Sequence, residues 1–533
     1  MSDCDYLIIG GGSAGCVLAN RLSENPATKV VLLEAGSRDT SPWIHLPAGM
    51  GRVITSTKYN WWFDSEPEPN LHNRRIPMAR GKVLGGSSSI NGMLYVRGHP
   101  SDYDQWAQMG NRGWSYQEVL PYFQKSENCN FSEGPSRGQG GPLEVSRVTS
   151  ENELANVFIK AALAEGFAFN ADYNSGDQDG FGHIQVTQKN GQRWSAARGY
   201  LHPVLDRKNL EVRTDAKVLR LELKDGRCTG AVYERDGRRE TISAQAEVIL
   251  AAGAVQSPQL LELSGIGCPQ ILSAAGVPVV KALPGVGRNY RDHFSPKLTW
   301  RVKKPVSLND RARGLPLAGE VLRYALTRRG LLSLPIAFAV GFVRSRPGLV
   351  APDIQYHFLP LTFEPGTRKL ESRPGMTVNL NPQRPNSTGS IHIKTGNPHQ
   401  APSIRTNFLA DGEDQRVVVE GLKIARRIVA NTAFDPYRAF ELQPGDAVRS
   451  NDEYLDYARA TGLTTYHAVG TCRMGADADP HAVVDDNLRV HGIDGLRVVD
   501  ASVMPTLVSG NTNAPVMMIA ERAADLIKSA ARA

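Results

Sequence analysis

Three glycines near the N-terminus, and an acid after them, have the types and spacing of a phosphate-binding turn. Gly10, Gly12 and Gly15 form the pattern G-x-G-x-x-G between the runs DYLIIG and VLANRL, and Glu34 ends a second apolar run. The first glycine permits a tight turn, the second lets backbone approach a pyrophosphate, and the third lets helix and strand pack closely. The helix N-terminus offers free N–H groups to phosphates, and an acid about 20 residues further on can bind a ribose diol. These residues predict a dinucleotide site for an unphosphorylated adenosine ribose, as in NAD or FAD.

The same turn contains a second pattern. Residues 11–15, GGSAG, match the G-x-S-x-G elbow that presents the nucleophilic serine of serine hydrolases. That elbow normally follows several strands, whereas Ser13 follows only the first strand-like run. A structural turn that binds nothing is a further alternative. The flanking strand, the helix and the spaced acid favour dinucleotide binding over both.

Length, charge and hydropathy restrict the remaining function classes. A chain of 533 residues predicts two domains, and 41% hydrophobic with 22% charged residues is typical of a soluble globular protein. The net charge of +7 suits an anionic membrane surface or an acidic substrate, although a solvated surface is the simpler interpretation. The sequence contains no block of lysine and arginine residues that would indicate nucleic-acid binding.

The longest apolar stretch, 331–343, is too short to span a bilayer and contains Pro335. It predicts a buried strand or helix, with a membrane-dipping or substrate-entry segment as the alternative.

The cysteines indicate the compartment. The chain has 6 cysteines, which are scattered and show neither C-x-x-C nor metal-ligand spacing. We therefore expect free thiols, a reducing compartment and no metal site. The first strand-like run begins by about Cys4, so we expect no signal peptide before it and a cytoplasmic location.

The elements that would position these residues come from distant parts of the chain. Strand-like runs that could join one nucleotide-binding sheet are DYLIIG, KVVLLE, NLEVRT at 209–214, AEVILAAG at 246–253 and LRVVDAS at 496–502. We therefore predict a discontinuous nucleotide-binding domain of residues 1–155, 196–300 and 456–533, and a second domain of 156–195 and 301–455. Strand patterns at 353–359, 376–381 and 389–394, with a helical run at 414–431, predict an antiparallel sheet with helices on one face. The loop-rich segment 36–80 is expected to wrap the cofactor or the domain boundary.

Four further motifs follow the glycine turn in a fixed order. They are RGKVLGGSSSINGMLYVRG at 80–98, GAVQSPQLLELSGIG at 253–267, YHAVGTCRMG at 466–475 and VVDASVMPTLVSGNTNAPVMMIAERAA at 498–524. Together the five motifs resemble the glucose–methanol–choline (GMC) oxidoreductases, a family of flavoproteins, from end to end of the chain. QKNGQRWSAARGYL at 188–201 and DHF at 292–294 resemble the branch of bacterial choline dehydrogenases and aliphatic (polyethylene glycol) alcohol dehydrogenases, with hydroxymethylfurfural and aryl-alcohol oxidases as near relatives. The resemblance implies an α/β FAD-binding domain of Rossmann-like GMC type and an α+β substrate domain with an antiparallel sheet.

The resemblance implies FAD as the cofactor, and the residue types support it. The glycine-serine stretch 85–89 lets backbone lie against a flat ring or a phosphate with little obstruction. The positions implied to bind FAD are Gly10, Gly12, Ser13, Ala14, Gly15, Glu34, Ala35, Arg80, Val83, Leu84, Ser87, Asn91, Gly92, Met93, Leu94, Val218, Ala252, Gly253, Tyr466, Asp500, Ala501, Asn511, Thr512 and Asn513. Some family members tether FAD covalently through a histidine in the second motif. This chain has Ile90 there, so we expect FAD to be held non-covalently.

The resemblance also identifies two candidate catalytic residues. His467 in TTYHAVG and Asn511 in SGNTNAP match the family's histidine and its partner. Oxidising an alcohol removes the hydroxyl proton and a hydride, and imidazole is a suitable base near neutral pH. We expect neutral His467 to take the proton, Asn511 to donate a hydrogen bond to the forming alkoxide, and the hydride to reach flavin N5. Asn513 lies two residues away and is the competing candidate for the role of Asn511. The helix that begins near Asn513–Ala514 is expected to point its N-terminus at the flavin pyrimidine.

The sequence leaves the substrate and the electron acceptor open. The likeness favours a primary-alcohol dehydrogenase that passes electrons to a quinone or another carrier, and the alternative is an oxidase that uses O2 and releases H2O2. Val469 or Thr465 is expected near the flavin edge where such reactivity is decided. A non-redox hydroxynitrile-type lyase is a third alternative, although those enzymes usually have histidine at the position of Asn511. Peripheral association with the inner membrane and the oligomeric state stay open.

Overall fold

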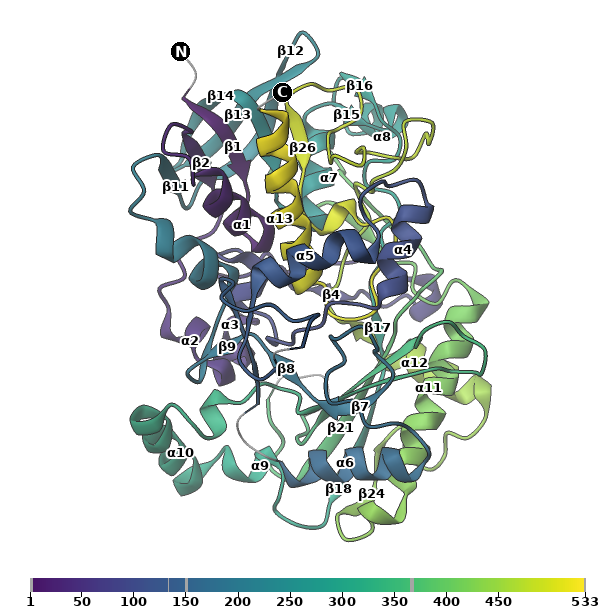
Figure 1. Cartoon of the computed structure of the whole chain (residues 1–533). Helices are drawn as coiled ribbons and strands as arrows, with labels where there is room; N and C mark the ends of the chain where they lie inside the picture. Colours follow the sequence, from purple (N-terminus) through teal and green to yellow (C-terminus); the bar gives the residue numbers. More distant parts are fainter. Residues whose placement is uncertain (1–2, 133, 149–151, 365–368, 532–533) are drawn as a thin grey trace.

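Two large sheets carry the fold, one in the upper and one in the lower half of Figure 1. The structure is a computed structural model that describes residues 3–132, 134–148, 152–364 and 369–531. The strand order of the upper sheet is β11-β2-β1-β14-β13-β12, and β26 pairs with the free side of the second half of β14. Its strands are β1 (Cys4–Ile9), β2 (Val30–Leu33), β11 (Leu210–Arg213), β12 (Lys217–Lys224), β13 (Arg227–Arg235), β14 (Arg238–Leu250) and β26 (Leu496–Val498). The five predicted runs therefore meet in one sheet, although the last is nearly 250 residues from its neighbour β14.

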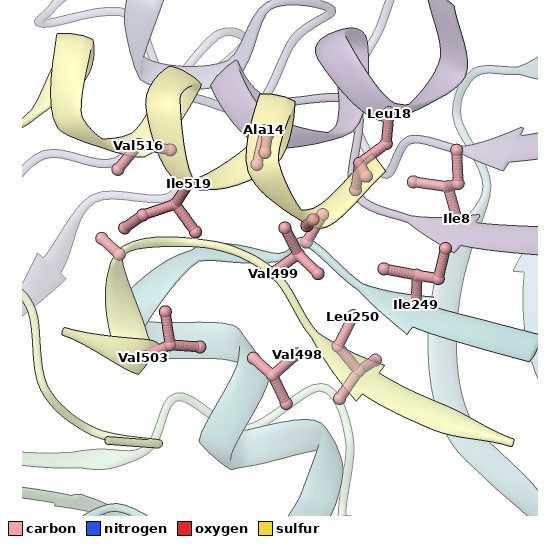
Figure 2. Packing of buried hydrophobic residues seen from close by; sticks show 14 of the residues in the cluster. Ile8, Ala14, Leu18, Ile249, Leu250, Val498, Val499, Val503, Val516 and Ile519 are labelled. Atoms are coloured by element: carbon pink, nitrogen blue, oxygen red, sulfur yellow. The ribbon is translucent and has the colours of Figure 1, made fainter. Parts of the chain in front are cut away.

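The parallel part of the upper sheet is apolar because both of its faces are covered. Strands β11, β2, β1, β14 and β26 are parallel where they pair, and every residue of β2, VVLL, is buried. Helices α1 (Ser13–Leu22) and α13 (Asn513–Ala530) pack on one face. Figure 2 shows Leu18 of α1 near Ile8 and Ile249 of the strands, and Ile519 of α13 in the same cluster beside Val499. The C-terminal helix thus completes the core that the N-terminal turn begins.

The lower sheet is antiparallel, with the strand order β24-β18-β21-β20-β19-β7. Its strands are β7 (Gly180–His183), β18 (Lys297–Val302), β19 (Ala339–Val343), β20 (Ile354–Leu359), β21 (Gly375–Pro382) and β24 (Arg438–Gln443). Helices α6 (Glu153–Ala164) and α11 (Gly412–Ala430) cover one face, where Phe158 stacks on Phe358 and the Tyr356 hydroxyl donates to the Gly421 carbonyl. Because side chains alternate along a strand, Gln355 and His357 face the other way, toward the upper sheet.

Two expectations about this second region are refined. The apolar stretch 331–343 forms a short helical turn, η6 (Leu331–Ser333), and then the buried strand β19, as the core interpretation predicted. The stretch 389–394 does form a strand, β22 (Ser390–His392), but β22 pairs with β23 (Ser403–Arg405) in a separate hairpin, so its expected place in the large sheet is wrong. The buried carboxylate of Glu262 in α7 (Gly253–Leu263) contacts His392 at 2.7 Å and accepts from the Ile393 amide, which holds the hairpin against the upper region.

The predicted domain boundaries need correction. The boundaries at 155/156, 300/301 and 455/456 fall inside α6, β18 and α12 (Asn451–Thr461), respectively. Each of these elements lies wholly on the side of the second domain. Their apolar residues, for example Leu154, Trp300 and Tyr454, belong to one hydrophobic core around the lower sheet. A boundary belongs in a loop rather than within an element. We therefore propose that the second domain comprises about residues 153–195 and 297–462.

The remaining helices and strands, most of them short, lie around the two sheets and between them. They are α2 (Pro42–His45), α3 (Met50–Val53), β3 (Phe63–Asp64), β4 (Pro77–Met78), α4 (Pro100–Gln108), α5 (Tyr116–Ser126), β5 (Glu127–Cys129), β6 (Leu143–Arg147), β8 (Gln185–Val186), β9 (Gln188–Lys189), β10 (Gln192–Arg193), β15 (Ile266–Gly267), α8 (Pro269–Ala274), β16 (Lys281–Ala282), β17 (Phe294–Ser295), α9 (Leu308–Arg311), α10 (Gly314–Thr327) and β25 (Leu463–Thr464). In the described ranges, no helix is long and apolar enough to cross a membrane. The 6 cysteines are buried and free, and no cluster of potential metal ligands occurs in the same ranges.

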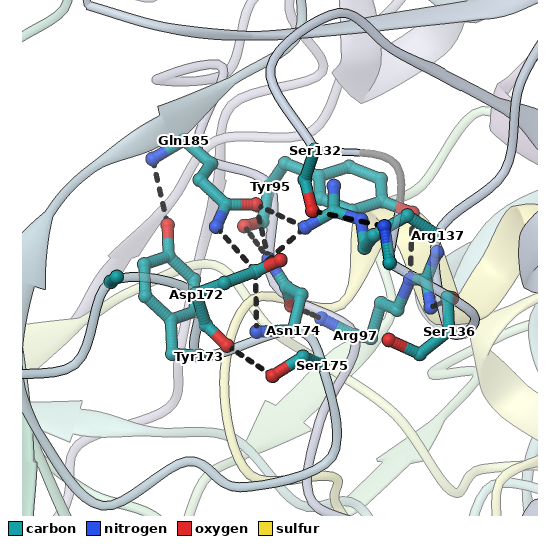
Figure 3. Close-up of polar contacts among 12 residues, drawn as sticks. Tyr95, Arg97, Ser132, Ser136, Arg137, Asp172, Tyr173, Asn174, Ser175 and Gln185 are labelled. Atoms are coloured by element: carbon teal, nitrogen blue, oxygen red, sulfur yellow. Dashed lines mark hydrogen bonds and ion pairs between the residues drawn. The ribbon is translucent and has the colours of Figure 1, made fainter.

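A buried ionic cluster fixes the segment that follows the second motif (Figure 3). Arg137 donates to Glu127 at 2.8 Å and to Asp172 at 2.7 Å, and Arg97 pairs with Glu127 at 2.6 Å. Buried charges are tolerated only when they are paired, so these contacts define one arrangement of the segment. Tyr95, whose carbonyl accepts from Asn174 at 3.1 Å, is anchored by the same cluster.

Candidate active site

One cavity of about 670 Å³ extends between the carboxyl ends of the upper strands and the inner face of the lower sheet. All predicted site residues line it except Gly15, Val83 and Leu84. Those that do are Gly10, Gly12, Ser13, Ala14, Glu34, Ala35, Arg80, Ser87, Asn91, Gly92, Met93, Leu94, Val218, Ala252, Gly253, Tyr466, His467, Asp500, Ala501, Asn511, Thr512 and Asn513. The loop-rich segment 36–80 also contributes lining residues, among them Met50 and Trp61.

Glycine occupies the three positions of the first motif for different structural reasons. Gly10 has φ +106°, and a Cβ there would lie 2.5 Å from the Ala251 carbonyl oxygen. A Cβ on Gly15 would lie 1.8 Å from the Gly10 carbonyl oxygen, so both positions are required by packing. A Cβ on Gly12 would meet nothing closer than Gly86 Cα at 3.9 Å, yet Gly12 lines the cavity. The bare backbone at Gly12 therefore leaves room for a ligand, as a pyrophosphate needs.

Glu34 lies at the end of β2, buried at the edge of the cavity. Its carboxylate accepts from the amides of Gly11 at 2.8 Å and Gly36 at 2.7 Å. Burial raises the pKa of Glu34 to about 7, and the two amide donors oppose that rise. Each carboxylate oxygen can still accept a further hydrogen bond, as binding to a ribose diol requires.

Two other residues of the nucleotide end take part in protein contacts. Asp500 follows β26, and its Oδ2 accepts from the Gly253 amide at 2.8 Å and from the Ser257 hydroxyl at 2.6 Å, so it also fixes the start of α7. Ser13 Oγ donates to Asn513 Oδ1 at 2.8 Å. An amide oxygen is no general base, so this contact gives the serine-hydrolase alternative no support.

His467 and Asn511 lie in contact at the other end of the cavity. Asn511 Nδ2 is 3.1 Å from His467 Nε2, whereas Asn513 contacts Ser13 instead. Asn511 Oδ1 accepts from Gln355 Nε2 of the lower sheet at 3.4 Å. The structure thus distinguishes the two asparagines that the sequence could confuse.

A chain of hydrogen bonds determines which nitrogen of His467 carries the proton. His293 Nε2 lies 3.2 Å from the Gln383 carbonyl, which can only accept, so that nitrogen carries the hydrogen of neutral His293. His293 Nδ1 is then an acceptor, and it lies 2.9 Å from His467 Nδ1. His467 therefore donates from Nδ1, with Thr465 Oγ1 a second partner at 2.9 Å. His467 Nε2 consequently carries no hydrogen, and its lone pair accepts from Asn511 Nδ2 at 3.1 Å.

The surroundings keep these imidazoles neutral. Burial lowers the pKa of His467 well below its ordinary value, and the nearby His293, His357 and Arg80 lower it further. Burial also lowers the pKa of His293 to about 4. A neutral, buried imidazole with an unprotonated Nε2 is available as a general base at neutral pH.

A buried carboxylate positions the loop that carries His467. Asp292 Oδ1 accepts from the His467 amide at 2.8 Å, and Oδ2 accepts from the Tyr290 hydroxyl at 2.8 Å and from the Thr464 hydroxyl. Burial raises the pKa of Asp292, while these donors oppose the rise. Tyr466 has φ +67°, an uncommon conformation for a residue with a side chain, and Arg80 donates to its carbonyl at 2.5 Å. Several contacts thus hold the backbone at Tyr466, next to His467, in an uncommon conformation.

Sequence reasoning missed several of these residues. Asp292 and His293 belong to the DHF motif, which the resemblance marked as typical of a branch without giving it a role. Gln355 and His357 belong to a strand that was predicted, and alternation along DIQYHFL could have placed both on one face. Val469, expected near the flavin edge, is buried in the core and does not line the cavity, whereas Thr465 does.

The inner face of the lower sheet lines the end of the cavity beside His467, which we call the substrate end because of its proposed role. His357 of β20, Asn379 of β21 and Lys297 of β18 are directly opposite one another across the strands, and all line the cavity. Asn381 Nδ2 donates to His357 Nδ1 at 3.1 Å, so the hydrogen of neutral His357 is on Nε2. That buried Nε2 has no hydrogen-bond partner among the described residues. Burial lowers the pKa of His357 to about 4.

The charges at this end are unbalanced. Lys297 is half-buried, and burial lowers the pKa of its ammonium, with the more distant Glu371 opposing the shift. The acids that line the cavity are Glu34 and Asp500, and both belong to the nucleotide end. Within the described parts of the chain, the substrate end therefore has a cation and an unpaired N–H donor but no carboxylate.

Two family models match the chain, and both are described as GMC oxidoreductase. The first matches residues 4–295 and the second matches residues 385–520. An oxygen-dependent choline dehydrogenase from Sinorhizobium medicae is 43% identical over 524 residues, which cover 98% of this chain and 95% of that protein. An alcohol dehydrogenase [acceptor] from Pseudomonas putida is 42% identical over 528 residues, with the same coverage of both chains.

Solved structures with the same architecture are also similar in sequence. A pyridoxine 4-oxidase from Mesorbium loti superposes with a TM-score of 0.89 at 32% identity, over 98% of this chain and 99% of that one. A formate oxidase from Aspergillus oryzae superposes with a TM-score of 0.92 at 27% identity, over 100% and 99%.

Proposed function

The chain belongs to the GMC oxidoreductase family, and we propose on that premise that it oxidises a primary alcohol to the aldehyde with His467 as the base. The motif-based predictions of the family, of the two-part fold class and of FAD as cofactor are confirmed. The substrate, the electron acceptor and the role of each residue are parts of the proposal.

The residues at the nucleotide end fit FAD. The bare backbone at Gly12 leaves room for the pyrophosphate, and the carboxylate of Glu34 would hold the adenosine ribose. The N-terminus of α13 reaches the cavity at Asn513 and would favour negative charge there. Ile90, at the position where some relatives carry a histidine, is buried and has no nucleophilic atom, which supports a non-covalent cofactor. When bound, FAD supplies the two-electron acceptor that takes the hydride.

The hydrogen-bond chain from Gln383 through His293 to His467 is the observation that carries the proposal. It leaves His467 Nε2 without a hydrogen, so that this nitrogen can accept the proton as the substrate O–H bond breaks. Asn511 Nδ2 donates to Nε2 in this structure, and we propose that it donates to the substrate oxygen instead while negative charge develops there. The carbon–hydrogen bond then breaks with its electron pair leaving as hydride, and the C–O bond becomes C=O. Burial of the His467 side chain limits the access of competing water to the proton transfer.

The charges favour an alcohol without a cationic group over choline, although relatives of both names are similar to this chain. A quaternary ammonium is recognised through aromatic faces and negative charge, and the substrate end has no carboxylate in the described residues. Lys297 would repel such a cation, whereas the hydrogen on His357 Nε2 suits an oxygen acceptor. We therefore propose a neutral or acceptor-bearing primary alcohol as the substrate.

For the electron acceptor we propose a quinone or another carrier, and O2 is the second candidate. The name of the Pseudomonas putida relative, alcohol dehydrogenase [acceptor], supports the first, and that of the Sinorhizobium medicae relative, oxygen-dependent choline dehydrogenase, supports the second.

The test is an anaerobic visible spectrum of the holoenzyme before and after each of a panel of primary alcohols and choline. We expect the oxidised flavin bands to bleach with neutral alcohols and to persist with choline. No bleaching by any alcohol would overturn the proposal and favour a non-redox lyase. Admitting air to the bleached sample separates the acceptors, because an oxidase recovers its colour rapidly and a dehydrogenase needs an added quinone.

Lys297→Glu sharpens the substrate assignment. The substitution places a carboxylate in the cross-strand row that contains His357, Asn379 and residue 297. We therefore expect choline to reduce the flavin faster than in wild type, and the rates with neutral alcohols to change less. Lys303→Glu, at an exposed site outside the cavity, is the matched control. Efficient choline oxidation by the wild-type protein would contradict the exclusion of cationic substrates.

A further inference from the structure

Helix α10 (Gly314–Thr327) exposes its apolar side chains instead of burying them. Leu315 is 88% exposed, Leu322 is 60% exposed and Leu326 is 76% exposed. Tyr324 is the one buried residue of this helix. In Figure 1 the helix projects from the lower left of the molecule, at its edge. Single exposed leucines are ordinary, but a row of them on one helix indicates a surface that binds something.

The apolar residues form a stripe. Leu315, Ala318, Leu322 and Leu326 follow one another at intervals of three or four residues, which places them along one face of the helix, and all are exposed. The polar residues of the opposite side hold the helix to the body of the protein. Glu320 pairs with Arg311 and accepts from the Leu331 amide at 2.8 Å, and the Tyr324 hydroxyl donates to the Gly191 carbonyl at 3.2 Å. The orientation is therefore the reverse of that in an ordinary surface helix, whose apolar stripe faces the core.

Positive charge surrounds this stripe. Arg313, Arg323, Arg328 and Arg329 are exposed, and the one acid between them in sequence, Glu320, is engaged by Arg311. An apolar stripe beside a group of arginines is the pattern of helices that lie in the interface of a membrane with anionic lipids. The arginines would contact the headgroups while the leucines enter the outer edge of the acyl layer.

We propose that α10 docks this protein on an anionic lipid surface through Leu315, Leu322 and Leu326, with the flanking arginines at the headgroups. This goes beyond the proposed oxidation and does not depend on it. It also moves the membrane-contacting role from stretch 331–343, which is largely core, to the helix immediately before it.

A second copy of the chain fits the stripe less well than a membrane does. A helix of 14 residues is about 21 Å long, so one face of it offers on the order of 200 Å², against the roughly 800 Å² per partner of a standard interface. A twofold contact through this stripe would also bring the same four arginines toward one another. A lipid surface is compatible with both the small apolar area and the positive charge of α10. It accepts a small apolar insertion, and its anionic headgroups attract the arginines.

The position of α10 relative to the cavity suggests a function for membrane docking, namely access of membrane-dissolved molecules to the cavity. The turn η6 follows α10 directly and contacts both it and the short helix η1 (Pro47–Gly49). Residues just beyond these two elements, Ile336 and Met50, line the cavity. A membrane bound by α10 therefore lies near the lining of the cavity, where apolar alcohols or a membrane quinone are concentrated.

Co-sedimentation of the full-length holoenzyme with vesicles tests the proposal. The vesicles are phosphatidylcholine alone, or phosphatidylcholine mixed with phosphatidylglycerol, at low and at high salt. We expect binding to the mixed vesicles that weakens with salt, because surface charges are screened. The double variant Leu322→Ser with Leu326→Ser should lose at least about tenfold in the partition coefficient. The triple variant Arg323→Gln, Arg328→Gln and Arg329→Gln should lose about fivefold per arginine on mixed vesicles and little on neutral ones.

The matched control is the double variant Val279→Ser with Val280→Ser, which removes exposed apolar side chains, 45% and 56% exposed, from another part of the molecule. It should bind vesicles as wild type does. All variants should oxidise a water-soluble alcohol at the wild-type rate, since α10 is outside the catalytic machinery. Equal vesicle binding by wild type and the leucine variant, or none by wild type, would overturn the proposal. A dimer in light scattering that the leucine variant dissociates would assign the stripe to a second copy instead.

Discussion

The two ends of the cavity are built in different ways. At the nucleotide end the site consists mainly of backbone and the Glu34 carboxylate: packing requires glycine at Gly10 and Gly15, and Gly12 leaves space. At the substrate end it consists of side chains from separate strands and loops, such as His467, His293 and Gln355. A backbone site needs particular residue types at a fixed spacing, so it is legible in the sequence. A site made of side chains requires only that distant segments of the chain meet in the fold. The spacing of residues in the sequence does not reveal such a meeting.

Gly15→Ala should have the largest effect, because it alters the backbone end where no rearrangement is available. The new Cβ would lie 1.8 Å from the Gly10 carbonyl oxygen. We expect a loss of roughly 3 kcal/mol or more in the free energy of unfolding, visible as a lower Tm and loss of FAD. Gly12→Ala is the paired variant, because its Cβ meets only open space. It should keep the Tm of the apoprotein and lose affinity for FAD. Equal Tm values for the two variants would contradict the distinction between packing glycines and cradle glycines.

His467→Ala tests the side-chain end, where the effect should be on chemistry alone. We expect anaerobic flavin reduction by the alcohol to slow by about 10²- to 10⁴-fold or more while FAD absorbance stays at the wild-type level. His72→Ala, at an exposed histidine that pairs with Asp456, is the control and should react normally. Reduction at wild-type speed in His467→Ala would rule out the base assignment.

His293→Leu should have a smaller effect, since it removes only one acceptor from the His467 Nδ1–H. Because Thr465 Oγ1 remains a partner of Nδ1, the loss is that of one hydrogen bond, about 0.5–1.5 kcal/mol, so the rate of flavin reduction should fall by roughly twofold to tenfold with little change in KM. The expected rescue is His293→Asn, whose amide can both accept from His467 and donate. If both variants lose activity equally, His293 is a packing residue and not the group that sets the tautomer.

The pH profile should give the smallest effect and sharpen the comparison further. Since burial lowers the pKa of His467, its neutral form persists below pH 6.5, where an exposed histidine would already be protonated. Acid then removes the base, so kcat/KM should fall as pH decreases, with a midpoint clearly below 6.5. A midpoint at or above 6.5 in the wild-type enzyme would show that His467 is solvated in the working state.

The sequence determined the parts of this protein that rest on local rules. The glycine turn, the acid at Glu34, five of the seven strands of the upper sheet and the five ordered motifs were all readable, because spacing and periodicity follow from backbone geometry. His467 and Asn511 were identified as candidates through the resemblance of their motifs alone, and their catalytic roles stay predictions. The stretch 331–343 was also assigned correctly to the core, since an apolar run without charges favours burial.

Only the tertiary structure decided which side chains work together. It separated Asn511 from Asn513, brought His293 and Gln383 to His467, and aligned His357 with Lys297 across three strands. It also turned the apolar stripe of α10 outward, although the same pattern in sequence predicts a helix packed on the core. These arrangements depend on contacts between residues tens to hundreds of positions apart. Their free energy comes from burial and pairing in the folded chain, and no local pattern of residues encodes it.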